Sequence, residues 1–460
     1  MRRKGLLKLI VGFGLVAVLT ISIPLVSGCT SPAPTPEPTP TPEPTPTPEP
    51  TPEPTPTPEQ KYVDIGFLCA LSGPEAGWGL PGLTGVKLWM DDVNSQGGLE
   101  VGGEKYMVRL HTYDDESISS KALLGAKELV LEHDVKFINS IGGGPTDACA
   151  PFFEEHGVFY APLMQDTKPE RKYCIVAEAN SKGDPLRAKH ISDAYPEAKT
   201  VAIASQDDPI GHITNAWEIG AYDAEGIEVV YEEYYSLDTI DFAPIVTAML
   251  AKDPDIMSWG CSYPGFDAAL YEQAYLQGFE GIICSNFIDL EATLAKVPAE
   301  WLVARASIDG YPEMDDPWWG DPSPQHDFYD EWQKRFGPGA PEDVGYAINP
   351  IDWDHVVTTT PWAYGCQLAG TFEPDAVLAA MRSADSLPTI LGPAIMWGEE
   401  MFGISNQILP HLFICEIEME NGKAVRRIAA EYDWAEYWEE NKDFLIKAAE
   451  DRGILYYQRD

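Results

Sequence analysis

The order of apolar and polar positions at the start of the folded part predicts a strand, a glycine-rich loop and a helix. Residues 63–71 are almost wholly apolar, which is typical of a strand covered on both faces of a parallel sheet. A glycine-rich loop follows over residues 72–85, and we expect Trp78 in it to be exposed. Apolar residues then recur at helical spacing over residues 83–93, and two glycines at 97–98 end the helix. In an open α/β sheet, a loop that leaves the carboxyl end of a strand is the usual place for a ligand, so this loop is a candidate binding site.

Strand and helix patterns alternate from residue 61 to about residue 308. Further strand-like apolar runs lie at residues 106–113, 135–141, 158–161, 201–204, 227–231, 256–259, 282–284 and 303–308. The clearest helix has Ser119 as its cap and an apolar face made of Ala122, Leu123, Ala126, Leu129 and Val130. Other helical patterns cover residues 211–224, 242–251, 266–277 and 290–296. Such alternation predicts parallel, doubly wound sheets, and because nine strands would make a large single sheet we expect two sheets in two lobes.

The pattern changes after residue 308. Residues 310–320 are rich in proline, acidic and aromatic residues, which indicates a loop or a crossover between lobes. Helices are predicted at residues 325–336, 350–368, 374–381 and 434–449. Two strand-like runs, 412–420 and 424–429, flank Asn421-Gly422-Lys423, which is a strong signal for a β-hairpin.

The first 60 residues have a composition that cannot form a packed core. Basic residues precede an apolar run over residues 9–26, and small residues then lead to Cys29, which is the layout of a signal peptide that resembles a bacterial lipobox. An uncleaved transmembrane anchor is the alternative. Residues 31–59 consist of proline, threonine and glutamate, so they should form an extended tether of roughly 90 Å. We therefore predict a lipoprotein signal peptide over residues 1–28 and a disordered tether over residues 29–60.

Composition excludes several classes of function. Acidic residues outnumber basic ones and the formal net charge is −42, so nucleic acid is not an expected partner. Seven cysteines follow Cys29, an odd number, and no disulfide framework is evident. Four of them lie in apolar runs, where buried thiols are expected: Cys69, Cys261, Cys284 and Cys415.

Motifs for hydrolysis, nucleotide binding and metal binding are missing from the sequence. It contains no G-x-S-x-G, no H-E-x-x-H and no phosphate loop that ends in Gly-Lys-Ser/Thr, and its eight histidines are scattered. The acid pairs Asp114-Asp115 and Asp207-Asp208 have the chemistry of glycosidase carboxylates, but adjacent acids at strand ends are more often loop or cap residues. We therefore expect neither an enzyme nor a bound cofactor or metal.

A second glycine-rich loop, residues 142–147, follows the predicted strand at 135–141 and opens a helix. Its glycines allow close approach of a ligand, and free N–H groups in a first helical turn bind anions. The alternative is a tight turn in which Thr146 or Asp147 caps the helix. Two such loops at strand ends together favour a binding site.

Several segments spread along the chain resemble one known family in their order and spacing. They are IGFLCALSGPEAGWG with the following VNSQGG, HTYDDES, PFFEEHGVFYAP, DFAPIVTAMLAKDPDIMSWG and LGPAIMWG. Residues 61–427 thereby resemble the type I periplasmic binding proteins of the branched-chain amino acid importers. The resemblance implies two Rossmann-like α/β lobes, joined by three crossovers, that close over a small ligand without catalysing a reaction. It places the first lobe at 61–183 and 309–395, the second at 184–308 and 396–430, and a C-terminal helical extension at 431–460.

The resemblance also implies which positions contact ligand. Carried over by position, these are Ser72, Trp78, Gly144, Pro145, Thr146, Gln165, Ile210, Tyr263 and Asn286. In amino-acid binders the loop at 144–146 holds the ligand carboxylate, and the position of Asn286 is an acidic residue that takes the ammonium. Here the loop has fewer hydroxyls and Asn286 lacks a charge, which argues against an α-amino acid. Trp78, Tyr263 and Phe287 suit an aromatic or apolar carboxylate, amide or ketone, although packing alone would also explain them.

Taken together, these patterns predict an extracytoplasmic solute-binding lipoprotein. It would be a monomer, anchored through the lipid on Cys29 to a bacterial membrane at the cell surface or in the periplasm. It would deliver an amino acid-like molecule, an aromatic acid or an amide to an ABC permease and its ATPase. Two alternatives remain: a ligand-sensing module of the same fold, and a secreted polymer-degrading enzyme suggested by the 13 tryptophans and the acidity.

Overall fold

The computed structural model describes residues 60–73, 75–177, 180–305 and 307–454. The predicted signal peptide, Cys29 and the tether lie outside these residues. Within the described part, no helix combines the length and the apolar character needed to cross a membrane.

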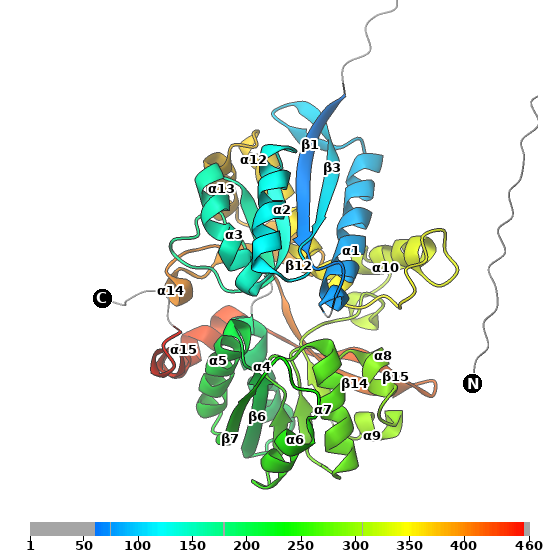
Figure 1. Cartoon of the computed structure of the whole chain (residues 1–460), viewed down its shortest axis with the longest axis vertical. Helices are drawn as coiled ribbons and strands as arrows, with labels where there is room; N and C mark the ends of the chain where they lie inside the picture. Colours follow the sequence, from blue (N-terminus) through cyan, green and yellow to red (C-terminus); the bar gives the residue numbers. More distant parts are fainter. Residues whose placement is uncertain (1–59, 74, 178–179, 306, 455–460) are drawn as a thin grey trace, which may run out of the picture. The chain divides into compact units, whose positions relative to one another are not determined.

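A five-stranded sheet forms the core of the first lobe (Figure 1). Its strand order is β2-β3-β1-β4-β5, with β2 (Leu99–Val101), β3 (Glu104–Asp114), β1 (Lys61–Cys69), β4 (Phe137–Gly142) and β5 (Phe159–Met164). Strand β1 pairs in parallel with β3 and β4, and β4 pairs in parallel with β5, whereas β2 is antiparallel to β3.

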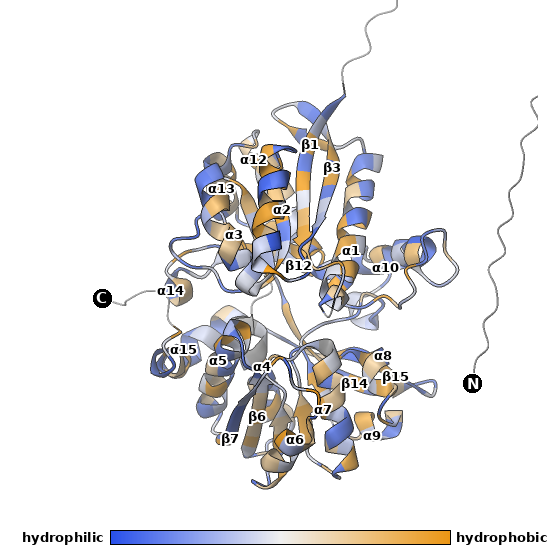
Figure 2. Ribbon diagram, viewed as in Figure 1, coloured by the Kyte–Doolittle hydropathy of each residue, from blue (hydrophilic) through white to orange (hydrophobic). Residues whose placement is uncertain are grey.

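Helices cover both faces of this sheet. Helices α2 (Ser119–Leu131) and α3 (Gly143–His156) pack on one face, and α1 (Ala76–Ser95) and α12 (Val356–Ala369) pack on the other. In α2 the buried residues Ala122, Gly125, Ala126 and Leu129 recur at helical spacing, and apolar and polar colours alternate along this helix in Figure 2. The sheet is therefore buried on both sides, as the apolar run of β1 predicted.

A seven-stranded sheet forms the second lobe. Its order is β15-β14-β10-β9-β8-β6-β7, with β15 (Lys423–Tyr432), β14 (Leu412–Glu420), β10 (Ser307–Asp309), β9 (Ile282–Cys284), β8 (Ile256–Ser258), β6 (Thr200–Gln206) and β7 (Glu228–Tyr235). Strands β6 to β10 are parallel, and β14 and β15 are added as an antiparallel hairpin. The two sheets are thus mixed: most of their strands are parallel, as predicted, and antiparallel strands are added at one edge, where the predicted hairpin of β14 and β15 lies.

Two layers of helices enclose the second sheet. One layer consists of α4 (Asn180–Ala194), α5 (Pro209–Ala224) and α15 (Trp434–Asp451), and the other of α6 (Ala243–Leu250), α7 (Pro264–Leu276) and α9 (Ala299–Val303), with α8 (Leu290–Leu294) beside α7. The predicted C-terminal helix is confirmed. Its Trp434, Tyr437 and Trp438 are buried in the core of the second lobe, so this helix belongs to the fold.

The segment between β10 and β14 packs largely against the first lobe. It contains η1 (Pro317–Trp319), α10 (Pro324–Phe336), α11 (Ile351–Asp354), α12, α13 (Pro374–Ser383), α14 (Glu399–Phe402) and a small sheet of β11 (Leu387–Thr389), β12 (Gly392–Trp397) and β13 (Gln407–Leu409). Helix α12 contacts β2 and β4, and α11 contacts α1. The chain therefore passes between the two sheets three times, after β5, after β10 and before β14.

Two of these crossings are joined to each other. The Val176 N–H donates to the Asn406 carbonyl (3.1 Å), and the Ile408 N–H donates to the Val176 carbonyl (2.7 Å). The fully buried Asn406 side chain also donates to the carbonyls of Lys172 and Cys174, each at 2.9 Å. These bonds tie strand β13 to the segment after β5, so the two crossings are hydrogen-bonded to each other.

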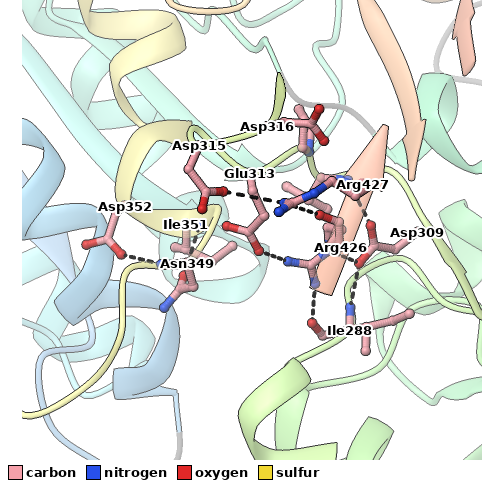
Figure 3. Close-up of polar contacts among 12 residues, drawn as sticks. Ile288, Asp309, Glu313, Asp315, Asp316, Asn349, Ile351, Asp352, Arg426 and Arg427 are labelled. Atoms are coloured by element: carbon pink, nitrogen blue, oxygen red, sulfur yellow. Dashed lines mark hydrogen bonds and ion pairs between the residues drawn. The ribbon is translucent and has the colours of Figure 1, made fainter. Parts of the chain in front are cut away.

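The remaining crossing, after β10, is held by Arg426 of β15, which is buried; Figure 3 shows the polar contacts of this residue. Its Nε donates to Asp309 Oδ2 (2.8 Å), its Nη1 pairs with Glu313, and its Nη2 donates to the Ile288 carbonyl. Although burial opposes ionisation, Asp309 and Glu313 hold the pKa of Arg426 above its usual value. A single guanidinium therefore binds the end of β10, the crossing after it and the loop after β9 together.

Four local predictions were wrong. Residues 77–85 belong to helix α1, not to a loop, because their glycines permit close packing: a Cβ on Gly79 would lie 1.9 Å from the Ala70 carbonyl oxygen. Ile118, not Ser119, occupies the N-cap position of α2. The predicted helix at 350–368 is divided into α11 and α12, and the strand at 303–308 begins only at Ser307, since Val303 ends α9. The short strands β2, β11, β12 and β13 were not predicted.

Other predictions were confirmed. The hairpin of β14 and β15 turns at Asn421 and Gly422, both with positive φ. Cys69, Cys261, Cys284 and Cys415 are buried, as expected, and the other three described cysteines, Cys149, Cys174 and Cys366, are buried free thiols as well.

Candidate ligand-binding site

A cavity of about 230 Å³ lies where strand ends of the two sheets face each other. Its wall comes from the segments that follow the carboxyl ends of β1, β3, β4, β5, β6, β7 and β8. The residues that line it are Glu75, Trp78, Ser117, Ser119, Ile141, Gly142, Gly143, Gly144, Pro145, Met164, Gln206, Asp208, Pro209, Ile210, Leu237, Cys261, Ser262 and Tyr263. This is the position at which open α/β sheets bind ligands.

Glu75 connects the two sides of the cavity. It precedes α1, and its Oε1 accepts a hydrogen bond from the Tyr263 hydroxyl (3.0 Å), which belongs to the N-cap residue of α7 in the second lobe. Its Oε2 accepts a hydrogen bond from the Ser117 hydroxyl in the first lobe. Burial, together with the charges of Glu75 and Asp208, raises the pKa of Tyr263. Tyr263 therefore stays neutral and acts as a hydrogen-bond donor.

Asp208 occupies the N-cap position of α5. Its Oδ1 accepts from the Gly211 N–H (2.7 Å), as an N-cap carboxylate should. Its Oδ2 accepts from Gln206 Nε2 (2.8 Å). Burial raises the pKa of Asp208, and the charge of Glu75 adds to this effect. The sequence had indicated a cap residue at this acid pair, and the structure confirms that role for Asp208.

Trp78 was expected to be exposed, and this prediction was wrong: only 2% of its surface is accessible. The residue lies in the first turn of α1, where its ring centroid is 5.6 Å from that of Phe287 in the second lobe. Its Nε1 has no hydrogen-bond partner within the described residues. A buried indole donor without a partner is unusual and makes Trp78 a polar as well as an apolar part of the wall.

The second glycine loop opens α3, as predicted. Gly142 and Gly143 have φ values of +123° and +61°, and a Cβ on Gly142 would lie 2.4 Å from the Met164 carbonyl oxygen, so glycine is required there. The alternative, in which Thr146 or Asp147 caps the helix, does not hold, since Gly142 is the N-cap and no side chain caps α3.

The structure brings five of the predicted site residues to the cavity wall: Trp78, Gly144, Pro145, Ile210 and Tyr263. Four others lie elsewhere. Ser72 is exposed and donates to Asp114 Oδ2 (2.7 Å), and Thr146 is buried and donates to Ser140 Oγ (3.0 Å). Gln165 donates to Asp147 (2.5 Å) and lines a small adjoining cavity, while Asn286 lines a separate cavity of about 50 Å³ beside Tyr311 and Trp353.

Sequence reasoning named none of Glu75, Ser117, Gln206 and Asp208, which also line the cavity, as a ligand-binding residue, although the turn before Gly211 that contains Asp208 matched a ligand loop of the family. Each is a polar residue that closely follows or ends a predicted strand, and this position was the available signal. Within the described residues, no group of three or more histidine, cysteine, aspartate or glutamate side chains is arranged to hold a metal ion. The arrangement can therefore enclose a small polar molecule, with hydrogen-bonding groups and aromatic rings from both lobes.

Comparison with known proteins agrees with this architecture. The family model of the periplasmic binding proteins matches residues 62–409. A Leu/Ile/Val/Thr-binding protein of Salmonella typhimurium is 23% identical over 208 residues, which cover 44% of this chain and 55% of that protein. The chain thus matches about half the length of this curated relative.

Solved structures share the fold over most of the chain. A solute-binding protein of an ABC transporter from R. palustris, in complex with 4-hydroxybenzoate, has a TM-score of 0.66 at 19% identity and covers 81% of this chain and 97% of its own. A branched-chain amino acid transporter substrate-binding protein from Streptococcus pneumoniae, in complex with isoleucine, has a TM-score of 0.61 at 16% identity and covers 81% and 100%. The resemblance to the type I periplasmic binding proteins is confirmed. This chain belongs to the periplasmic binding protein family, a non-enzymatic family that includes the type I solute-binding proteins of ABC transporters.

Proposed function

We propose that this protein is the extracytoplasmic receptor of an ABC importer and captures a small solute between its two lobes. The observation that carries the proposal is the cavity whose wall is made by strand ends of both sheets. Its volume of about 230 Å³ corresponds to that of about eight water molecules, which suits a small metabolite. Isoleucine and 4-hydroxybenzoate, the ligands of two structural relatives, are molecules of this kind.

The proposed mechanism is closure of the lobes around the solute. A ligand that contacts both walls stabilises the arrangement in which the walls are close, by its difference in affinity for the two states. The bond from Tyr263 to Glu75 and the contact between Trp78 and Phe287 already join the walls. The crossings joined through Val176 and Asn406 would act as the hinge. The permease would then recognise the closed form and release the solute for the ATPase-driven import step.

A thermal-shift screen of the full-length protein in detergent tests the proposal. Amino acids, aromatic acids, amides and amines should be screened, because a ligand that binds only the folded state raises the melting temperature. We expect one chemical class to raise it selectively and to bind by calorimetry with one site per chain. Failure of every class to stabilise the protein would contradict a role in solute capture.

Membrane anchoring is a separate part of the proposal, and it depends on Cys29. A lipid on Cys29 followed by the tether at 31–59 would hold the binding lobes near the membrane that contains the permease. Cys29→Ala should abolish incorporation of labelled fatty acid and should release the protein from the membrane fraction. Retention of this variant in the membrane would instead support an uncleaved transmembrane segment.

A further inference from the structure

The wall of the cavity carries negative charge without a positive partner. Glu75 and Asp208 both line it, and none of the described residues that line it is lysine, arginine or histidine. His212 lies near Asp208, but its Nε2 pairs with Asp207 (2.9 Å) and it does not line the cavity. Arg171, on the first-lobe side, pairs with Asp147 (2.6 Å).

Both carboxylates are held only by uncharged donors in the contacts described. The Tyr263 and Ser117 hydroxyls bond Glu75, and the Gly211 N–H and the Gln206 amide bond Asp208. Such bonds fix the orientation of the carboxylates, but no basic side chain among the described residues that line the cavity pairs with either of them. Removing water from this site on closure makes that charge costly unless a cation enters.

The side chain of Gln206 gives an independent indication that the cavity lacks a hydrogen-bond donor beside this residue. Its side chain is fully buried and lines the cavity, yet its Oε1 has no hydrogen-bond partner within the described residues. The amide orientation follows from chemistry, because Nε2 must be the atom that donates to the Asp208 carboxylate. The remaining Oε1 is therefore an unused acceptor beside two carboxylates, and its natural partner is an N–H donor.

The aromatic part of the cavity wall also suits a positively charged ligand. Trp78 and Tyr263 both line the cavity, and aromatic faces attract cations. A ligand carboxylate near Glu75 and Asp208 would instead meet like charge, which is strongly unfavourable in a dehydrated site.

We propose that the ligand carries a protonated nitrogen, an ammonium or guanidinium group, that binds among Glu75, Asp208 and Gln206. This inference rests on the proposed function and specifies its substrate class. It places the cation at the loops after β1 and β6. It does not place the cation at Asn286, the position that takes the ammonium in amino-acid binders, because Asn286 lines a different cavity. Cationic amines and zwitterions therefore bind, and anions such as aromatic carboxylates do not.

A matched ligand series tests the charge requirement. The probes are 3-methylbutylamine, L-leucine and 4-methylpentanoate, and phenethylamine, L-phenylalanine and 3-phenylpropanoate, with 4-hydroxybenzoate as a further anion. Binding to the full-length protein is measured by calorimetry and by thermal shift at pH 7. We expect binding only from molecules with a protonated nitrogen, in at least one of the two series.

Matched variants then locate the cation. Glu75→Gln and Asp208→Asn remove charge but keep hydrogen-bonding groups, and asparagine is itself a good N-cap for α5. Each should weaken amine binding by roughly 30-fold or more, the effect expected for a buried charged contact. Glu116→Gln and Asp207→Asn are the controls, since these neighbouring acids pair with Lys121 and His212 and do not line the cavity. The controls should bind within about twofold of the parent protein.

The outcomes separate this inference from the proposed function. Binding of 4-hydroxybenzoate or another anion, but of no amine, would overturn the charge assignment and leave solute capture intact. Amine binding that persists unchanged in Glu75→Gln and Asp208→Asn would overturn the location. The absence of binding by any probe in this series and in the wider screen would overturn both proposals.

Discussion

Two groups of acidic side chains in this protein look alike in composition but differ in their partners. At the crossing after β10, Asp309 and Glu313 share the buried Arg426, whose guanidinium also bonds the Ile288 carbonyl. At the cavity, Glu75 and Asp208 have neutral donors only, and Gln206 leaves an acceptor unused. Arg426 comes from a strand more than a hundred residues away from Asp309, so the fold supplies a cation at one group and none at the other.

The difference in partners separates a charged group with a structural role from one to which we assign ligand binding as a proposal. Buried charges persist when they are paired and hydrogen-bonded, and the Arg426 group meets this condition within the chain. Glu75 and Asp208 at the cavity would meet this condition only when a ligand brings the positive charge. The first group should therefore govern stability, and the second should govern affinity with little effect on the unliganded fold.

The largest expected effect is loss of stability on removal of Arg426. Arg426→Met keeps much of the side-chain volume but leaves Asp309 buried without its cation. We expect the free energy of unfolding to fall by about 3–5 kcal/mol, because breaking a buried pair leaves an uncompensated charge. Denaturant titration monitored by circular dichroism measures the change.

Arg427→Met is the matched control for Arg426→Met. Arg427 is the next residue in β15, and its Nε and Nη2 bond the more exposed Glu420 at 2.8 and 2.9 Å. Loss of a partly exposed pair should cost about 1 kcal/mol or less. Equal destabilisation by the two variants would remove the distinction between a buried structural group and an ordinary surface pair.

Asp115 is a buried acid that lies close to Glu75 of the cavity, and its substitution should have the next largest effect. Burial, with the charges of Glu75 and Asp114, raises the pKa of Asp115 to about 6. Because the folded pKa lies above the unfolded value, the folded state binds the proton more tightly, and stability falls as pH rises from about 4 to about 6. One pKa unit corresponds to about 1.4 kcal/mol. The free energy of unfolding of Asp115→Asn should therefore rise by about 3 kcal/mol relative to that of the parent protein as the pH rises over this range.

The neighbouring Asp114 provides a control of opposite sign. Although burial opposes it, hydrogen bonds from Ser72, from the backbone N–H groups of Leu71 and Glu116, and from the backbone of Ser72 hold the pKa of Asp114 below its usual value. Its contribution to stability is present above the unfolded pKa and is lost as pH falls through the folded pKa. Asp114→Asn should therefore destabilise the protein at pH 7, and unfolding curves from pH 3 to pH 8 distinguish the two signs. A pH-independent effect of Asp115→Asn would contradict the raised pKa.

A smaller effect is expected when the indole N–H of Trp78 is removed. Trp78→Phe keeps an aromatic ring against Phe287 but deletes the donor that has no partner in the protein. If the ligand accepts this hydrogen bond, the binding free energy should weaken by about 1 kcal/mol, measured by calorimetry. Trp89→Phe, on the same helix but outside the cavity wall, should leave affinity unchanged. Equal affinities of the two variants would assign Trp78 to packing alone.

The smallest expected effect is that of Glu75→Gln on the unliganded protein. The substitution removes one of several like charges and keeps a side chain that can bond Tyr263 and Ser117. We expect the free energy of unfolding without ligand to change by about 0.5 kcal/mol or less, as for most substitutions outside packed or paired sites. A loss as large as that of Arg426→Met would show that Glu75 is structural and would erase the contrast between the two groups.

The sequence by itself determined the fold class and the order of most elements. The apolar run of β1, the alternation up to β10, the hairpin at Asn421-Gly422 and helix α15 follow local periodicity, which each segment carries in its own residues. The two glycine-rich segments lie at one cavity, which Trp78, Gly144, Pro145, Ile210 and Tyr263 line.

Only the tertiary structure decided which polar groups have partners. Glycines in α1 looked like a loop because the sequence pattern does not show their close contacts, that of Gly79 with the Ala70 carbonyl and that of Gly85 with the Asp352 carbonyl in α11. Asn286 was assigned to the ligand by position, yet it lines a separate cavity, whereas Glu75 and Asp208 meet from different lobes. Compensation of charge depends on distances across the fold, and a sequence pattern contains no such distances. The contrast between Arg426 with its acids and the cavity acids without a cation is therefore a property of the folded chain.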